Sequence, residues 1–78
     1  MIKLYQFENC PFCEKVRKYM REHGIKWEKI EVDRNNKPEE VTSTGGTVPV
    51  IQLEDGTLIS DSSRIIEYLE KNVVGKAA

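Results

Sequence analysis

The two cysteines of the sequence, Cys10 and Cys13, are separated only by Pro11 and Phe12. Thiol–disulfide exchange needs a thiolate, and an ordinary cysteine with a pKa of about 8.5 is mostly protonated at neutral pH. Thiols at this spacing can close a small reversible disulfide, whereas a permanent bridge across two residues would restrain almost nothing. The motif therefore indicates a redox-active pair rather than a structural disulfide.

The segments on either side of the motif predict that it lies at the start of a helix. Residues 2–7 alternate apolar and polar side chains, which predicts a strand that ends just before the motif. Pro11 is typical of a first helical position, and apolar side chains recur at helical spacing until Gly24 ends the helix. Cys10 would then cap this helix, and Cys13 would lie in its first turn.

A helix N-terminus favours an anion at Cys10, because it presents unpaired amides and a partial positive charge. The amides of Phe12 and Cys13 are the expected donors, and Pro11 is expected to stiffen the turn between the two thiols. Cys13, being less exposed, should keep the higher pKa and react only after a mixed disulfide has formed on Cys10. The predicted order of attack is therefore Cys10 first, with Cys13 as the resolving thiol.

The remainder of the chain predicts an α/β fold, a four-stranded mixed sheet flanked by three helices. The strand–helix–strand order near the N-terminus favours a parallel strand pair, and the turn at Asp55 and Gly56 favours an antiparallel hairpin. With 78 residues, positions 1–78 are expected to form one domain, ordered over 2–73 and followed by a short tail. The elements predicted after the first helix are a strand within residues 25–33, a short helix from Pro38, strands at 47–53 and 57–59, and a final helix capped at 61–63 with Val73 in its last turn.

The composition argues against several classes of function. The 12 basic and 13 acidic residues are interspersed and give a net charge of −1, so no nucleic-acid-binding patch is expected. No apolar run reaches membrane-spanning length and no secretory signal pattern is present, so we expect a soluble cytoplasmic monomer without a membrane partner. His23 lies ten residues past Cys13, roughly 15 Å along one helix, which argues against a shared metal site. The charged pairs of the first helix are interpreted as its solvated face: Glu14 with Lys15 and Arg17 with Lys18.

Two motifs in the second half are expected to lie near the cysteines. On its residues alone, Pro49 is a strand-start proline, and the bond from Val48 is cis in about one such case in twenty. A cis bond would turn the Val48 backbone toward the site, free to pair with an extended substrate. Asp61 and Ser62 are typical of a helix N-cap, and the free amides of a helix start could also bind the carboxylate of a peptide.

From residue 2 to about residue 72 the chain resembles glutaredoxins, and its second half is similar to the N-terminal domain of glutathione S-transferases. The motifs that carry the resemblance are Cys-Pro-Phe-Cys at 10–13, Thr-Val-Pro at 47–49, and Leu-Ile-Ser-Asp-Ser at 58–62 followed by Ile-Ile-Glu-Tyr-Leu at 65–69. The resemblance implies a thioredoxin-like fold with a cis bond before Pro49. It also implies that the Val48 backbone pairs with the cysteinyl part of glutathione and that Asp61 and Ser62 bind its γ-glutamyl end.

The sequence departs from most glutaredoxins at two places. They usually carry Gly-Gly and an aspartate where this chain has Ser-Asp-Ser-Ser at 60–63, so the likeness is to glutaredoxins that share the transferase signature. They also usually place a lysine a few residues before the first cysteine, where this chain has Phe7. The change removes a cation that would stabilise the thiolate and hold the glycine carboxylate of glutathione. Lys37 is interpreted either as a partial substitute in glutathione binding or as a solvated surface lysine.

The resemblance implies a glutathione-dependent oxidoreductase that reduces protein disulfides and protein–glutathione mixed disulfides. Glutathione would supply the electrons, and no tightly bound cofactor or metal is expected. Three alternatives stay open: a redoxin reduced by thioredoxin reductase, an iron–sulfur cluster carrier, and a non-catalytic binding module. Pro11 and Cys13 count against the cluster carrier, because cluster-carrying relatives usually have glycine and serine at the corresponding positions.

Overall fold

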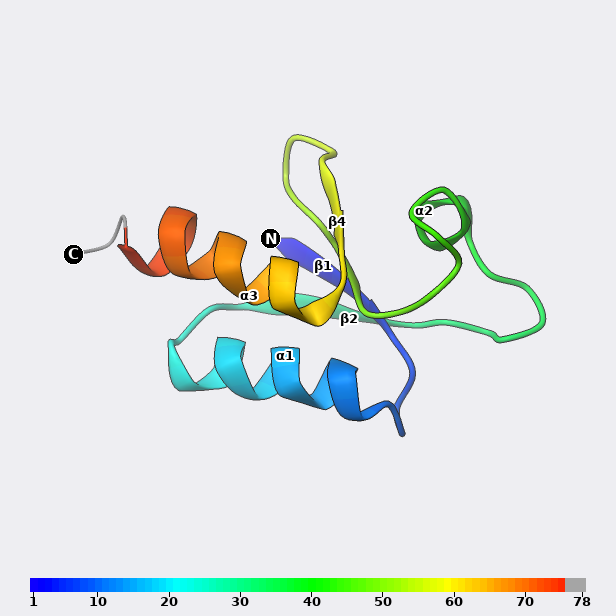
Figure 1. Ribbon diagram of the computed structural model, residues 1–78, viewed down its shortest axis with the longest axis horizontal. Helices are drawn as coiled ribbons and strands as arrows, with labels where there is room; N and C mark the ends of the chain where they lie inside the picture. Colours follow the sequence, from blue (N-terminus) through cyan, green and yellow to red (C-terminus); the bar gives the residue numbers. More distant parts are fainter. Residues whose placement is uncertain (76–78) are drawn as a thin grey trace.

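The computed structural model describes residues 1–75, and it confirms the predicted α/β fold of four strands and three α-helices (Figure 1). A π-helical segment, η1, follows the last α-helix. Within these residues no helix is both long and apolar enough to cross a membrane. In chain order the elements are β1 (Ile2–Gln6), α1 (Pro11–Glu22), β2 (Trp27–Glu31), α2 (Glu39–Thr42), β3 (Val50–Gln52), β4 (Leu58–Ser60), α3 (Ser62–Leu69) and η1 (Glu70–Val74).

The strands form one mixed sheet in the order β2-β1-β3-β4. β1 and β2 run parallel, with Ile2 opposite Trp27, and α1 makes the crossover between them. β3 is antiparallel to both β1 and β4, and the predicted turn at Gly56 joins β3 to β4. Gly56 adopts a φ of +94°, a left-handed conformation that glycine adopts at little cost. β1 therefore lies in the middle of the sheet, and the loop that carries the cysteines continues directly from its C-terminal end.

Alternation along β1 divides the core between the two faces of the sheet. Leu4 points toward α1 and α3, which lie side by side in Figure 1, whereas Tyr5 points toward α2. The buried side chains on the first face are Leu4, Val16, Met20, Ile51, Ile65 and Leu69. Those on the second face are Tyr5, Val32, Val41 and Val50. Because α1 and α3 are fixed against the same sheet face, the N-termini of these two helices are held in a constant relation to each other.

Two elements differ from the sequence-based expectation. The strand predicted from residue 47 begins only at Val50, because Pro49 has no backbone N–H to donate to a ladder. The final helix, predicted as one α-helix, is α-helical through Leu69 and π-helical from Glu70 to Val74, with Val73 packed against the first core cluster. The tail predicted to follow residue 73 begins later, because Val74 still belongs to η1 and Gly75 is its C-cap; residues 76–78 lie outside the described residues.

Candidate active site

Cys10 is the N-cap residue of α1, as the sequence predicts. Its backbone is extended (φ −90°, ψ 119°), and its Sγ accepts a hydrogen bond from the Cys13 amide at 3.4 Å. The Cys10 carbonyl accepts the first helical bond, from the Glu14 amide at 3.0 Å. Cys10 is partly exposed, whereas Cys13, in the first turn, is fully buried. A disulfide substrate in solution can therefore reach the first sulfur but not the second.

The environment of the two thiols separates their pKa values. Burial opposes ionisation of Cys10, but the amide and thiol of Cys13, the Phe12 amide and the Arg17 charge together lower the pKa of Cys10 below its ordinary value. For Cys13, burial is the largest cause and raises the pKa to about 12; hydrogen bonding to the Phe7 backbone lowers it, and the neighbouring Cys10 adds to the rise. Cys10 is thus the thiol that ionises first, while Cys13 holds its proton at neutral pH.

A shallow groove of about 400 Å³ lies beside the motif. Phe12, which is 62% exposed, lines this groove together with Val48 and Pro49, and the bond between the last two is cis, as the resemblance implies. The sheet topology thus brings residues that are far apart in the sequence to one place. The lining residues are Phe12, Thr47, Val48, Pro49, Asp61 and Ser62.

Asp61 and Ser62 lie at the N-terminus of α3, where the groove meets this helix. Asp61 is the N-cap, and its carboxylate Oδ1 accepts a hydrogen bond from the Ser63 amide at 3.1 Å. Its φ of +72° lies in the left-handed region, which aspartate tolerates better than most residues. Ser62, the next residue, is buried. The cap that the sequence predicts is present, and its aspartate side chain is exposed to solvent at the groove.

Two basic residues between β2 and α2, Lys37 and Arg34, are held by specific contacts. Lys37 does not line the groove, but its Nζ donates to the Gly46 carbonyl at 2.7 Å, immediately before Thr47. Arg34, which the sequence analysis did not single out, places its guanidinium carbon 4.3 Å from the centre of the Phe7 ring. A positive charge therefore lies over the ring of Phe7, the position at which glutaredoxins usually have a lysine.

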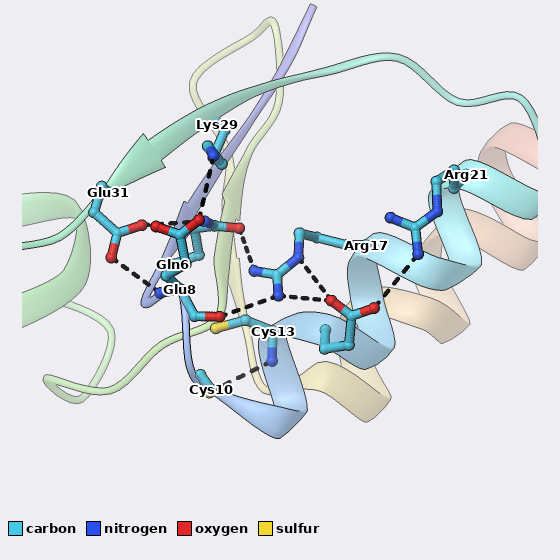
Figure 2. Close-up of polar contacts among 9 residues, drawn as sticks. Gln6, Glu8, Cys10, Cys13, Arg17, Arg21, Lys29 and Glu31 are labelled. Atoms are coloured by element: carbon cyan, nitrogen blue, oxygen red, sulfur yellow. Dashed lines mark hydrogen bonds and ion pairs between the residues drawn. The ribbon is translucent and has the colours of Figure 1, made fainter.

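Arg17 corrects the interpretation of the charged face of α1. Its side chain is only 13% exposed, and its guanidinium donates to the side-chain oxygen of Gln6, to the Glu8 carbonyl and to the Glu14 carboxylate (Figure 2). Gln6 is buried and donates in turn to Glu31. The sequence spacing did indicate that Arg17 is not fully solvated, because Arg17 follows the buried Cys13 by four residues and therefore lies on the same face of the helix.

His23 is the C-cap residue of α1, and the centre of its ring lies 4.3 Å from that of Tyr19. Within residues 1–75, no group of three or more histidine, cysteine, aspartate and glutamate side chains is arranged to hold a metal ion.

The sequence match identifies the family to which this site belongs. Residues 4–77 match the family described as glutathione S-transferase, N-terminal domain. The chain belongs to this family. Among curated relatives of this glutathione S-transferase N-terminal domain is prostaglandin E synthase 2 from Danio rerio, which is 35% identical over 75 residues, covering 96% of the chain but only 20% of the relative.

Solved structures of similar sequence share the fold of this glutathione S-transferase N-terminal domain. A rice glutathione transferase in complex with glutathione matches with a TM-score of 0.82 and 29% identity, over 90% of this chain and 32% of the rice chain. The dehydroascorbate reductase of Chlamydomonas reinhardtii matches with a TM-score of 0.81 and 30% identity, over 90% of this chain and 37% of that one. The chain thus spans between a fifth and two fifths of the length of these proteins.

Proposed function

We propose that this chain is a glutathione-dependent thiol–disulfide oxidoreductase of the glutaredoxin type, with Cys10 as the attacking thiolate and Cys13 as the resolving thiol. The observation that carries the proposal is the separation of the two thiols: the pKa of Cys10 is lowered, whereas that of Cys13 is raised to about 12. Only a thiolate attacks a disulfide at a useful rate. Support also comes from the similar structures, one of which contains glutathione and another of which is a reductase.

In the proposed reaction, the Cys10 thiolate attacks the glutathione sulfur of a protein–glutathione mixed disulfide. The protein thiol leaves as a thiolate and takes a proton from water, and glutathione is now bound to Cys10 by a disulfide. A second glutathione thiolate attacks this bond, forms glutathione disulfide and regenerates Cys10. One glutathione of this product comes from the substrate and the other from solution, so one disulfide forms for each disulfide cleaved.

The second cysteine gives the mixed disulfide between Cys10 and glutathione a second way to react. Cys13 loses its proton and attacks the Cys10 sulfur, which releases glutathione and closes the disulfide between the two cysteines. Two further glutathione molecules reopen this disulfide. Reduction of a disulfide within a protein follows the same path, because Cys13 then displaces the substrate from Cys10.

We propose the groove as the glutathione site. Its volume of about 400 Å³ falls within the usual range for a small ligand, about 300–1,000 Å³. Asp61 offers a carboxylate to the amine of the γ-glutamyl end, and the start of α3 at Ser62 offers amides to its carboxylate. The backbone of Val48 would pair with the cysteinyl part. Lys37, held beside Thr47 through Gly46, would attract the glycine carboxylate.

The decisive experiment is steady-state reduction of a small glutathione mixed disulfide by the purified chain, with glutathione and glutathione reductase as one electron source and thioredoxin reductase as the other. We expect turnover with glutathione and none with the Cys10→Ser variant. Turnover only with thioredoxin reductase would keep the cysteine chemistry but refute the glutathione site. Activity that survives Cys10→Ser would refute the redox mechanism and favour a binding module.

Two further arms of this experiment address other reactions of the same residues. Conjugation of glutathione to an electrophile, without disulfide reduction, would show that the glutathione thiol rather than Cys10 is the nucleophile. Visible absorbance after anaerobic reconstitution with iron and sulfide, lost in Cys10→Ser, would indicate a cluster carrier. We expect no conjugation, because the lowered pKa of Cys10 favours its own attack on disulfides. We expect no cluster, because Pro11 and Cys13 stand where cluster-carrying relatives usually have glycine and serine.

A further inference from the structure

Among residues 1–75, Arg17 is the one largely buried cation in contact with the loop of residues 7–10 (the cysteine loop), and the steps of the proposed reaction do not use it directly. Its Nη1 donates to Gln6, its Nη2 donates to the Glu8 carbonyl at 3.4 Å, and both Nη2 and Nε donate to one oxygen of Glu14, at 2.7 and 3.2 Å. Burying a guanidinium costs free energy unless its donors are satisfied. Here the partners are the strand, the loop and the helix that together position Cys10.

We propose that Arg17 is the positioning residue of the redox site: it ties the loop of residues 7–10 to helix α1, and its charge, shared with Glu14, stabilises the Cys10 thiolate. This inference rests on the proposed function, because it assigns Arg17 a part in thiolate chemistry.

The first step of the argument is the placement of the loop. Figure 2 shows the Glu8 backbone held from both sides, since its carbonyl accepts from Arg17 and its amide donates to Glu31 Oε2 at 2.9 Å. Glu31 also accepts from Gln6 at 3.1 Å, so strand β2 is joined to the same network. Cys10 follows Glu8 by two residues, and its own amide donates to the Phe7 carbonyl at 3.3 Å. The contacts of Arg17 therefore hold the backbone of the loop two residues before the nucleophile.

The second step concerns charge. Arg17 is largely removed from solvent, so its field on the nearby sulfurs is screened less than that of an exposed cation. Glu14 lies on the solvent side and opposes that field; it also binds Arg21 at 3.4 Å. In agreement with this geometry, the Arg17 charge lowers the pKa of both thiols. Removing Arg17 and removing the charge of Glu14 should thus have opposite effects on Cys10.

Other charged groups face this region from the neighbouring elements, and they are left unchanged in the test. Glu8 in the loop lies 4.0 Å from Lys29 of β2, and Glu31 ends the same strand. Arg21 lies on α1 itself, and Asp61 precedes α3.

The test is the rate of alkylation of Cys10 by iodoacetamide as a function of pH, followed by the mass of the modified peptide. This readout needs no glutathione, so it succeeds or fails independently of the proposed function. Arg17→Gln should slow alkylation at neutral pH about three- to tenfold and shift the profile to higher pH. Glu14→Gln should accelerate it about twofold and shift the profile to lower pH. The matched control is Lys18→Gln, which removes an exposed charge one residue further along and should leave the profile unchanged.

Arg17→Lys keeps the charge but not the guanidinium fork, and its rate should fall between those of Arg17→Gln and the unmodified protein. The inference is overturned if Cys10 in Arg17→Gln is alkylated at the same rate as in Lys18→Gln. It is also overturned if Glu14→Gln slows alkylation as Arg17→Gln does, because effects in the same direction would reflect disturbed structure rather than charge. Should circular dichroism show Arg17→Gln to be unfolded, Glu14→Gln decides alone: faster alkylation supports the inference, and an unchanged or slower rate overturns it.

Discussion

Release of glutathione from Cys10 by Cys13 should be limited by ionisation of a buried thiol. Cys13 is fully buried with a pKa of about 12, so at pH 7 only about one molecule in 100,000 carries its thiolate. Part of the rise comes from Cys10 and disappears once Cys10 is bound to glutathione, but burial, the largest cause, remains. The rate of release should therefore increase about tenfold for each pH unit between about pH 6 and pH 8.

A single-turnover experiment isolates this step. The reduced protein is treated with glutathione disulfide to form the mixed disulfide on Cys10, excess reagent is removed, and the pH is then raised rapidly. Glutathione released over time is measured after quenching with acid. Cys13→Ser is the matched control and should release no glutathione at any pH, because its hydroxyl cannot displace a thiolate.

The same control should still turn over a glutathione mixed disulfide with free glutathione, within about threefold of the unmodified rate, since that route needs only Cys10. A rate of glutathione release that does not change with pH would refute the reasoning, because a thiol with a raised pKa must gain thiolate as the pH increases. Loss of mixed-disulfide turnover in Cys13→Ser would also contradict it, by showing that Cys13 takes part in the first attack.

Three further predictions concern stability and glutathione binding. The pKa of Cys13 is raised by folding, so this thiol contributes its full stability below its unfolded pKa and progressively less above it. Relative to Cys13→Ser, the reduced protein should therefore lose up to about 1.4 kcal/mol of unfolding free energy per pH unit above about pH 9. Urea titrations at several pH values measure this loss, and parallel pH dependences of the two proteins would refute the prediction. Asp61→Ala removes the helix cap, so it should lose about 1 kcal/mol of unfolding free energy and also raise the KM for glutathione. Asp61→Asn should keep the cap and raise only the KM. An unchanged KM in both variants would exclude Asp61 from glutathione binding. Lys37→Gln should raise the KM for glutathione about two- to fivefold without altering Cys10 alkylation, and a KM equal to that of the unmodified chain would assign Lys37 to the solvated surface.

The elements that the sequence predicts well are those determined by local chemistry. Pro11 at the start and Gly24 at the end delimit α1 without reference to the rest of the chain, and both boundaries agree with the structure to within two residues. β3 is shorter than the apolar pattern in this segment predicts, because a strand must also donate backbone N–H groups to its neighbour and Pro49 has none. The π-helical segment η1 has no counterpart in the apolar spacing, since Val73 is compatible with either kind of turn.

The same distinction applies to the candidate site. Cys10 as cap and Cys13 in the first turn follow from sequence neighbours, so their geometry was predictable. The groove joins Phe12 to Val48 and Asp61, which lie tens of residues apart; the order of the predicted elements indicated that these loops meet, and the family resemblance indicated what they would bind. Arg17 could not be placed from its helix alone, because its partners come from β1 and from the loop that follows it.

Phe7 stands where glutaredoxins usually have a lysine, and two arginines contact the cysteine loop here. A lysine in the loop would supply a mobile, well-hydrated cation. Here the cations are two arginines from other segments: Arg34 is held against the Phe7 ring, and Arg17 is held beneath the loop by Gln6 and Glu8. A guanidinium fixed by several contacts loses little further entropy when an anion forms beside it. In the proposed role of Arg17, the fixed charge near the nucleophile depends on its contacts with β1, the cysteine loop and α1 remaining intact.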